Sequence, residues 1–433
     1  MIDLFKTLIA DFHARGLPGH VVTRDLSVPL NTKKIISIIG PRRAGKTWLI
    51  YSLIQKLQKS SDRQNIVYVN FEDERINSDP KNLGLIIDAY QQMYPARILS
   101  DVYFFLDEIQ VMQNWEKFVR RLADTVSPHI FLTGSSAKLL GHEIAGALRG
   151  RALTFTLFPL SFKEYLRFQA KDESPEFQTT AGRNRIEAAF DRFLLEGGYP
   201  ETLSMDESLR MRTLQSYFET MIYRDVVERY AVRRPHLVKD LARRLLANNA
   251  RIFSVHKYYR DLKSRGVRVT KDTLYDLIDH FTDALFIVPV GKADASAAKQ
   301  AQALKKYYVN DTGLSNACLF VPAEDRGAQL ETLVLLELYK QGKNIAYYSG
   351  TNECDFLVLD RGKITGAFQV CHELNENNRR REYAGLQSAM RRYGLGQALL
   401  ITRRQEEEFQ TDAGRILVRP AWKWSLSADI LAS

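Results

Sequence analysis

The sequence is poor in cysteine and has no long apolar run. Its 433 residues include three cysteines, Cys318, Cys354 and Cys371, without a Cys-x-x-Cys pair, which argues against structural zinc and against a disulfide framework. No apolar stretch reaches the roughly 18 residues that would cross a membrane, and the first residues lack a signal-peptide layout. The composition, 45% hydrophobic and 26% charged, is typical of a packed globular chain. We therefore predict a cytoplasmic protein of two or three domains without membrane contact.

A phosphate-binding loop follows the first apolar run, residues 35–39. The loop matches G-x-x-x-x-G-K-[ST] and leads into a helix-like segment, which is the strand-to-helix setting that this motif requires. Its nucleotide-binding candidates are Gly40, Pro41, Arg42, Arg43, Ala44, Gly45, Lys46, Thr47 and Trp48. Backbone N–H groups would face the phosphates, Lys46 would supply a positive charge, and the Thr47 hydroxyl would bind Mg²⁺. The sequence therefore predicts nucleotide binding.

Two acidic residues follow another apolar run, residues 102–106. Asp107 and Glu108 would lie at the carboxyl end of a buried parallel strand, beside the phosphate loop. Asp107 is placed to hold Mg²⁺ with its water, and Glu108 to polarise the water that attacks the terminal phosphate. An acidic exit from a strand is common, so the pair gains its meaning from the phosphate loop. Together they predict nucleotide hydrolysis.

A third strand, residues 129–133, ends in hydroxyl side chains. Thr133, Ser135 or Ser136 could sense the terminal phosphate, although an ordinary Gly-Ser turn explains the same residues. Downstream, Arg149 and Arg151 include a candidate arginine finger, which would stabilise the transferring phosphoryl group in a neighbouring subunit. A solvated basic loop is the competing explanation, and the sequence does not say which arginine would act.

These motifs, in this order, resemble the predicted prokaryotic ATPases of the AAA+ superfamily. The resemblance extends over nearly the whole chain, and is carried by the phosphate loop, residues 104–110 with Trp115, and residues 132–136, 148–151, 158–165 and 197–201. In that family a C-terminal domain of unknown function follows the ATPase. The resemblance implies ATP rather than GTP, an α/β fold with a parallel sheet flanked by helices, and an ability to form rings or other homo-oligomers. It implies little about the biological task.

The pattern along the chain divides it into five regions. They are an N-terminal lead-in (1–30), the ATPase core (31–168), a helical lid or connector (169–232), a winged-helix-like region (233–324) and a restriction-endonuclease-like α/β region (325–433). The fourth region reads as three helices followed by two strands. A winged helix contacts either DNA or protein, and both alternatives stay open. Its cations favour phosphate contacts, whereas Asp272, Asp276 and Asp279 on its third helix would repel them.

The last region resembles the PD-(D/E)xK nuclease fold in the order of its residues. Glu331 lies on a helix-like segment, Asp355 opens one strand, and the next strand contains Gln369 and Cys371. In the resembled fold a carboxylate would replace Gln369 and a lysine would replace Cys371. An amide is a weak Mg²⁺ ligand, and a thiol cannot stabilise charge as an ammonium does. We expect an inactive nuclease scaffold that could still bind nucleic acid or protein.

The charge balance leaves two functions open. With 61 Lys and Arg against 51 Asp and Glu, the chain carries +10, which favours a polyanionic partner without proving one. The first function is a Mg²⁺-dependent ATPase that acts as a DNA-associated motor or switch. The alternative is a nucleotide-gated regulator that contacts a protein partner and has no DNA-directed activity. Stimulation of ATP turnover by DNA would separate them.

Overall fold

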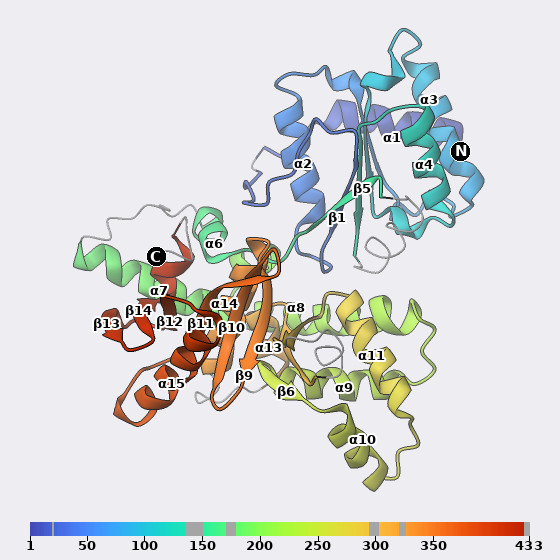
Figure 1. The fold of residues 1–433 in the computed structure, drawn as a ribbon. Helices are drawn as coiled ribbons and strands as arrows, with labels where there is room; N and C mark the ends of the chain where they lie inside the picture. The colour runs from blue at the N-terminus through green and yellow to red at the C-terminus, as the bar shows by residue number, and fades with distance from the viewer. Residues whose placement is uncertain (20, 136–149, 170–178, 294–302, 320–325, 428–433) are drawn as a thin grey trace. The chain divides into compact units, whose positions relative to one another are not determined.

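The chain forms two compact units, Met1–Leu157 and Phe158–Ser433, each considered by itself (Figure 1). In this computed structural model the described residues are 1–19, 21–135, 150–169, 179–293, 303–319 and 326–427. Among their helices, none combines the length and the apolarity that a membrane span needs. The finer division into five regions stays a prediction.

The first unit is built on a five-stranded sheet whose neighbouring strands are all parallel. Its strands are β1 (Ile35–Ile39), β2 (Ile66–Asn70), β3 (Tyr103–Asp107), β4 (Ile130–Gly134) and β5 (Ala152–Thr156). Their order across the sheet is β2-β3-β4-β1-β5. Strands β1 and β4 are buried along their whole length, as expected for a parallel sheet covered on both faces. The expected parallel sheet flanked by helices is therefore confirmed.

Helices cover both faces of this sheet. Helix α2 (Lys46–Leu57) lies on one face, and α3 (Leu85–Met93) and α4 (Trp115–Thr125) lie on the other (Figure 1). Helix α1 (Ile2–Arg15) buries Phe5 and Ile9 and packs against α3 and β2. His13 anchors the C-terminal end of α1, because one ring nitrogen lies 2.9 Å from the Tyr94 hydroxyl and the other lies 2.8 Å from a carbonyl of β2. The N-terminal helix is thus part of the packing of the first unit.

The second unit is built on a mixed nine-stranded sheet of order β13-β14-β12-β11-β10-β9-β7-β8-β6. The strands are β6 (Arg251–Phe253), β7 (Ile287–Lys292), β8 (Lys305–Val309), β9 (Asn344–Ser349), β10 (Glu353–Asp360), β11 (Lys363–Val370), β12 (Gln397–Thr402), β13 (Glu407–Thr411) and β14 (Gly414–Pro420). Strand β7 pairs in parallel with β9. The two regions that sequence patterns separate near residue 325 therefore share one sheet.

The central strands of this sheet alternate between two apolar layers. Phe356 and Phe368 face the cluster that contains α14 (Arg326–Lys340) and α16 (Ala421–Ser425). Leu357 and Ala367 face the opposite cluster, which contains α15 (Glu376–Tyr393). This alternation follows from the two-residue period of a strand, which sends successive side chains to opposite faces.

The remaining helices of the second unit are mostly short and amphipathic. They are α6 (Phe162–Phe168), α7 (Thr180–Glu196), α8 (Glu207–Thr220), a π-helical turn (Met221–Glu228), α9 (Pro235–Ala247), α10 (Val255–Ser264), α11 (Lys271–Asp283) and α13 (Thr312–Cys318). Side chains of α8 to α11 and α13 form one apolar core with residues of β7 and β8. Ser254 and Thr270 cap α10 and α11 by accepting backbone hydrogen bonds, which fixes where these helices begin.

A glycine turn after α7 is held by a buried carboxylate. Gly197 has φ 78°, and a Cβ added there would lie 2.2 Å from Asp311 Oδ1. Asp311 in turn accepts hydrogen bonds from the backbone N–H groups of Gly198 (2.6 Å) and Leu314 (2.9 Å). The turn therefore needs both the left-handed conformation and the missing side chain of glycine.

We expect Gly197→Ala to destabilise the protein by about 3 kcal/mol or more, because backbone strain and a steric clash add together. Chemical denaturation would measure the loss. Gly342→Ala is the matched control, since Gly342 has φ 70° and open space around its missing side chain. Equal losses in the two variants would show that contact with Asp311 contributes nothing.

Candidate functional site

The phosphate loop connects β1 to α2 and packs closely against Leu157, the last residue of the first unit. A Cβ at Gly40 would lie 2.3 Å from the carbonyl oxygen of Leu157, so a side chain has no room there. Arg24, which is buried, donates to the Ala44 carbonyl at 2.9 Å. Lys46 begins α2, and its Nζ donates to the carbonyls of Gly40 (3.1 Å) and Pro41 (3.4 Å). The side chain of Lys46 therefore folds back over the phosphate loop and contacts its first two residues.

Two carboxylates at the end of β3 meet the loop. Glu108 Oε1 lies 3.2 Å from Lys46 Nζ, and both side chains are largely buried. The Thr47 hydroxyl donates to Asp107 Oδ2 at 2.8 Å. The fold therefore brings the predicted phosphate-loop residues and the predicted acidic pair into direct contact, although about 60 residues separate them.

Thr133 at the end of β4 links the Asp107 carboxylate to the backbone of Glu108. Its hydroxyl donates to Asp107 Oδ1 and accepts the backbone N–H of Glu108 at 2.9 Å. Tyr68 on β2 donates to Asp107 Oδ2 at 3.0 Å. Asp107 therefore accepts hydrogen bonds from three hydroxyl groups, which fix its orientation. The contacts of Thr133 are those of a residue able to respond to both acidic groups.

The environment drives the two neighbouring acids apart in pKa. Burial raises the pKa of Asp107, and the three hydroxyl hydrogen bonds oppose that effect only in part. Burial acts in the same direction on Glu108, but the Lys46 ammonium and the Gln110 amide outweigh it and lower the pKa of Glu108. Glu108 is thus the carboxylate that stays ionised most readily, as a residue that polarises water must.

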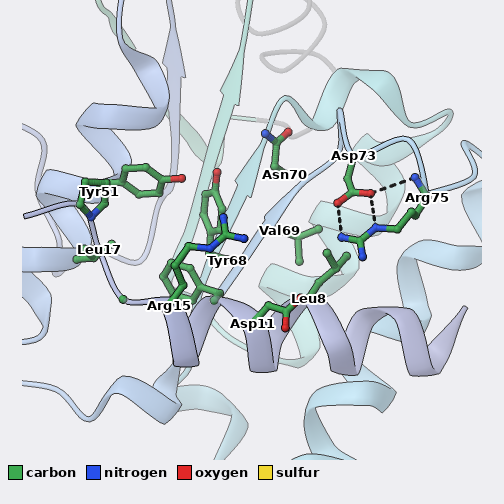
Figure 2. A pocket seen from close by; sticks show the side chains of 13 residues that line it. Leu8, Asp11, Arg15, Leu17, Tyr51, Tyr68, Val69, Asn70, Asp73 and Arg75 are labelled. Atoms are coloured by element: carbon green, nitrogen blue, oxygen red, sulfur yellow. Dashed lines mark hydrogen bonds and ion pairs between the residues drawn. The ribbon is translucent and has the colours of Figure 1, made fainter.

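A cavity of about 500 Å³ lies beside this site, between α1 and β2 (Figure 2). Tyr68 forms part of its wall, with its ring centroid 5.1 Å from that of Phe12 and 5.5 Å from that of Tyr51. Asp73 and Arg75 form an ion pair at its edge. Because the Tyr68 hydroxyl reaches Asp107, the cavity wall and the acidic site share one side chain.

The donor set fits a magnesium ion. A threonine hydroxyl and a carboxylate are hard oxygen ligands, and Mg²⁺ commonly takes one or two such protein ligands and fills its octahedron with water and substrate phosphates. In the described part of the chain, no group of three or more His, Cys, Asp or Glu side chains is arranged to hold a metal. Thr47 and Asp107 place such oxygens beside the phosphate loop, and they are the residues that would hold the ion.

The other predicted site residues have varied surroundings. Arg42 pairs with Glu72 at 3.0 Å, Arg43 has a left-handed φ of 67°, and Trp48 is half exposed beside Tyr51. Ser135 is buried directly after β4. Ser136 and Arg149 lie outside the described residues.

Arg151 is engaged within its own unit. Its Nη1 contacts both carboxylate oxygens of Asp124 on α4, at 2.6 and 2.7 Å, and about two fifths of its side chain is exposed. To act on a neighbouring subunit, this guanidinium would have to leave Asp124.

The second unit gathers the predicted nuclease-like residues around a lysine. Lys306 on β8 is 5% exposed, and its Nζ lies 3.2 Å from Glu331, 2.7 Å from Glu353 and 3.2 Å from Asp355. The Tyr308 hydroxyl also donates to Glu331, at 2.7 Å. Burial alone would lower the pKa of Lys306, but the three carboxylates raise it, so the ammonium stays charged. The three carboxylates of this cluster are therefore paired with an ammonium of the protein itself.

Gln369 and Cys371 also have partners. The Gln369 amide accepts the Asp355 N–H (3.3 Å) and donates to Glu382 on α15 (2.8 Å). The Cys371 thiol donates to the Glu373 carbonyl (3.0 Å), and burial raises its pKa to about 11. It is therefore a neutral thiol near pH 7.

Sequence reasoning missed six residues of these sites: Arg24, Tyr68, Lys306, Tyr308, Glu353 and Glu382. A signal existed only for Lys306, a charged residue two positions before Tyr308 and so on the same face of a strand that is buried after its first residue. Arg24 and Glu382 reach their partners through the fold, and their local sequence does not mark them.

The fold and the site together define a P-loop nucleotide-binding domain of the AAA class. Residues 32–166 match the family described as an AAA domain, and residues 187–325 match a domain of unknown function (DUF8612). This confirms the expectation of an AAA ATPase domain followed by a domain of unknown function.

An uncharacterized protein of Methanocaldococcus jannaschii is 34% identical over 444 residues, which cover 99% of this chain and 97% of the relative. The chain belongs to the family of that protein. An uncharacterized protein of Haemophilus influenzae is 27% identical over 351 residues, covering 79% of this chain and 83% of its own. Among solved structures, the Aeropyrum pernix ORC1 protein in complex with DNA shares 13% identity, with 75% of this chain and 92% of that chain covered, at a TM-score of 0.29. That score is too low to support an argument about function.

Proposed function

We propose that this protein is a cytoplasmic Mg²⁺-dependent ATPase that acts as a DNA-associated motor or switch. The observation that supports hydrolysis is the buried contact set behind the phosphate loop, in which Lys46 meets Glu108 and Thr47 meets Asp107. The pKa of Glu108 is lowered, which suits a residue that orients and polarises water.

Each residue has a proposed part in ATP hydrolysis. Lys46 binds the outer phosphates of ATP, and Thr47 and Asp107 hold Mg²⁺, which supplies positive charge to the phosphate oxygens. Glu108 orients the attacking water, and Thr133, which contacts the Asp107 carboxylate and the Glu108 backbone N–H, acts as a sensor, with Ser135 and Ser136 as the neighbouring candidates. Lys46 and Glu108 contact one another directly. When Lys46 binds phosphate, its contact with Glu108 loosens, so Lys46 connects phosphate binding to the mobility of the Glu108 side chain.

Lys46→Ala should abolish ATP binding and turnover, because the loop loses the ammonium that lies over it. Binding of a fluorescent ATP analogue and release of phosphate would measure the two effects. Lys33→Ala is the control, since Lys33 is an exposed lysine just before β1. Full turnover in Lys46→Ala would contradict the assigned site.

We propose that the ATPase forms homo-oligomers in which Arg149 or Arg151 acts in a neighbour's site. Alanine at the acting arginine should lower turnover by about 10³-fold or more. Mixing that variant with Lys46→Ala should restore part of the activity, because each subunit supplies the group that the other lacks. Unchanged turnover in both single arginine variants would remove the arginine finger from the mechanism.

For the second unit, we propose a winged-helix-like region followed by an inactive nuclease-like region. The three helices α9, α10 and α11 followed by β7 and β8 support the first assignment. For the second, Glu331 and Asp355 already contact the ammonium of Lys306, and Gln369 uses its amide on Glu382 and the backbone. Carboxylates neutralised by the protein's own cation are poor ligands for a metal that would activate water.

A nucleotide-gated regulator of a protein partner is the second candidate. It is favoured by the exposed acidic residues Asp272, Asp276 and Asp279 on α11, which suit a basic protein surface better than a phosphate backbone. ATP turnover measured with and without duplex DNA separates the candidates. Stimulation by DNA supports the motor or switch, and its absence supports the regulator.

A further inference from the structure

A basic groove lies where the helices α9, α10 and α11 meet. Its volume is about 760 Å³, and four of its lining side chains are cationic: Arg233, Arg234, Lys263 and Arg268. None of its thirteen lining residues is acidic. Tyr259 adds an aromatic wall, and the Lys271 ammonium lies 5.6 Å from the centroid of that ring. The groove therefore concentrates positive charge from three helix ends on one surface.

The four cations lack acidic partners. Across the described part of the chain, no carboxylate lies within ion-pair distance of Arg233, Arg234, Lys263 or Arg268, whereas the nearby Arg265 pairs with Asp240 and Asp261. All four are exposed. The Arg234 guanidinium donates to the Arg268 carbonyl, which holds one arginine in place within the groove. Exposed cations without a counter-charge repel one another, and a bound anion would relieve this repulsion.

We propose that this groove binds the phosphodiester backbone of duplex DNA. Guanidinium groups suit phosphate because their planar N–H donors match two phosphate oxygens at once. The proposal rests on the proposed association with DNA and assigns it to one surface. The acidic face of α11 (Asp272, Asp276 and Asp279) would repel DNA if that helix entered the major groove. The junction of the three helices, and not the face of α11, makes the contact.

A contact made only to phosphates has two measurable properties. Affinity does not depend on base sequence, and it falls steeply with salt because bound phosphates release counterions. Four contacts give a slope of about −3.6 for log affinity against log salt concentration, which is a loss of roughly 10²-fold between 50 and 200 mM salt.

Fluorescence anisotropy of the full-length protein with labelled duplexes of two unrelated sequences tests the proposal. The measurement is made without ATP, so a failure of ATP hydrolysis leaves it readable. In the triple variant Arg233→Ala, Lys263→Ala and Arg268→Ala, we expect affinity to fall by at least tenfold at 100 mM salt and the salt slope to shrink by about 3. Both duplexes should behave alike.

The control variant removes the same charge elsewhere in the second unit. It carries Lys363→Ala, Arg380→Ala and Arg392→Ala, three exposed cations, and should keep its affinity within about threefold. Three results would each overturn the proposal: native protein that does not bind DNA, equal losses in the two triple variants, or equally tight binding of polyglutamate. The last result would identify an acidic protein as the fitting partner.

Discussion

Glu108→Gln should lower ATP turnover by about 10²–10⁴-fold while leaving ATP binding intact. The amide has nearly the shape of the carboxylate, so the end of β3 keeps its packing, but it has no negative charge with which to polarise water. Glu108 is buried, and its backbone N–H is held by Thr133, so the change acts on one functional group at a fixed position.

The same substitution also removes the ion pair with Lys46. The freed ammonium should bind phosphate at least as well as before, so the affinity for ATP should stay equal or rise. Single-turnover kinetics and equilibrium binding would separate the two effects. Glu74→Gln is the control, because Glu74 is an exposed acid of the same unit. Turnover in Glu108→Gln equal to that of the native protein would end the role assigned to Glu108.

The nucleotide site could be predicted because its parts are contiguous in sequence. The phosphate-loop motif comprises eight consecutive residues, and five consecutive apolar residues indicate the strand before Asp107. Parallel strands then meet at one edge, which brings Lys46 and Glu108 together without further information. Thr133 was predictable on the same ground, since β4 lies between β1 and β3.

The second unit was harder to predict because its key contacts join distant segments. The parallel pairing of β7 with β9 joins strands more than 50 residues apart, and nothing in either strand marks its neighbour. The amide of Gln369 donates to Glu382 on helix α15. The sequence shows that position 369 has no carboxylate, but it does not show this hydrogen bond. Position 371 lacks the lysine of the resembled fold, and Lys306 on β8 brings an ammonium to three carboxylates. A pattern confined to one strand cannot detect a contact that another strand supplies.

The Lys306 cluster therefore predicts a large stability effect. Replacing one partner of a buried ion pair leaves the other charge without compensation and typically costs about 3–5 kcal/mol. Lys306→Met keeps an unbranched side chain as far as Cε and removes the ammonium from Glu331, Glu353 and Asp355. We expect the free energy of unfolding at pH 7 to fall by about that amount. Lys305→Met is the control, since Lys305 is the exposed neighbour on the same strand.

The pH dependence of Lys306→Met distinguishes electrostatics from packing. Burial already raises the pKa of Glu331 and of Asp355, and without the ammonium these values should rise further. A carboxyl group whose folded pKa is raised contributes stability that is fully present below its unfolded pKa and is lost as pH rises from there through the folded pKa. The variant should therefore recover much of its loss between pH 7 and pH 5, relative to the native protein at each pH. Denaturant titrations at the two pH values measure this, and a loss that is the same at both would show that Lys306 acts through packing. Recovery at pH 5 would mean that the Lys306 ammonium stabilises the second unit by compensating the negative charge of Glu331 and Asp355.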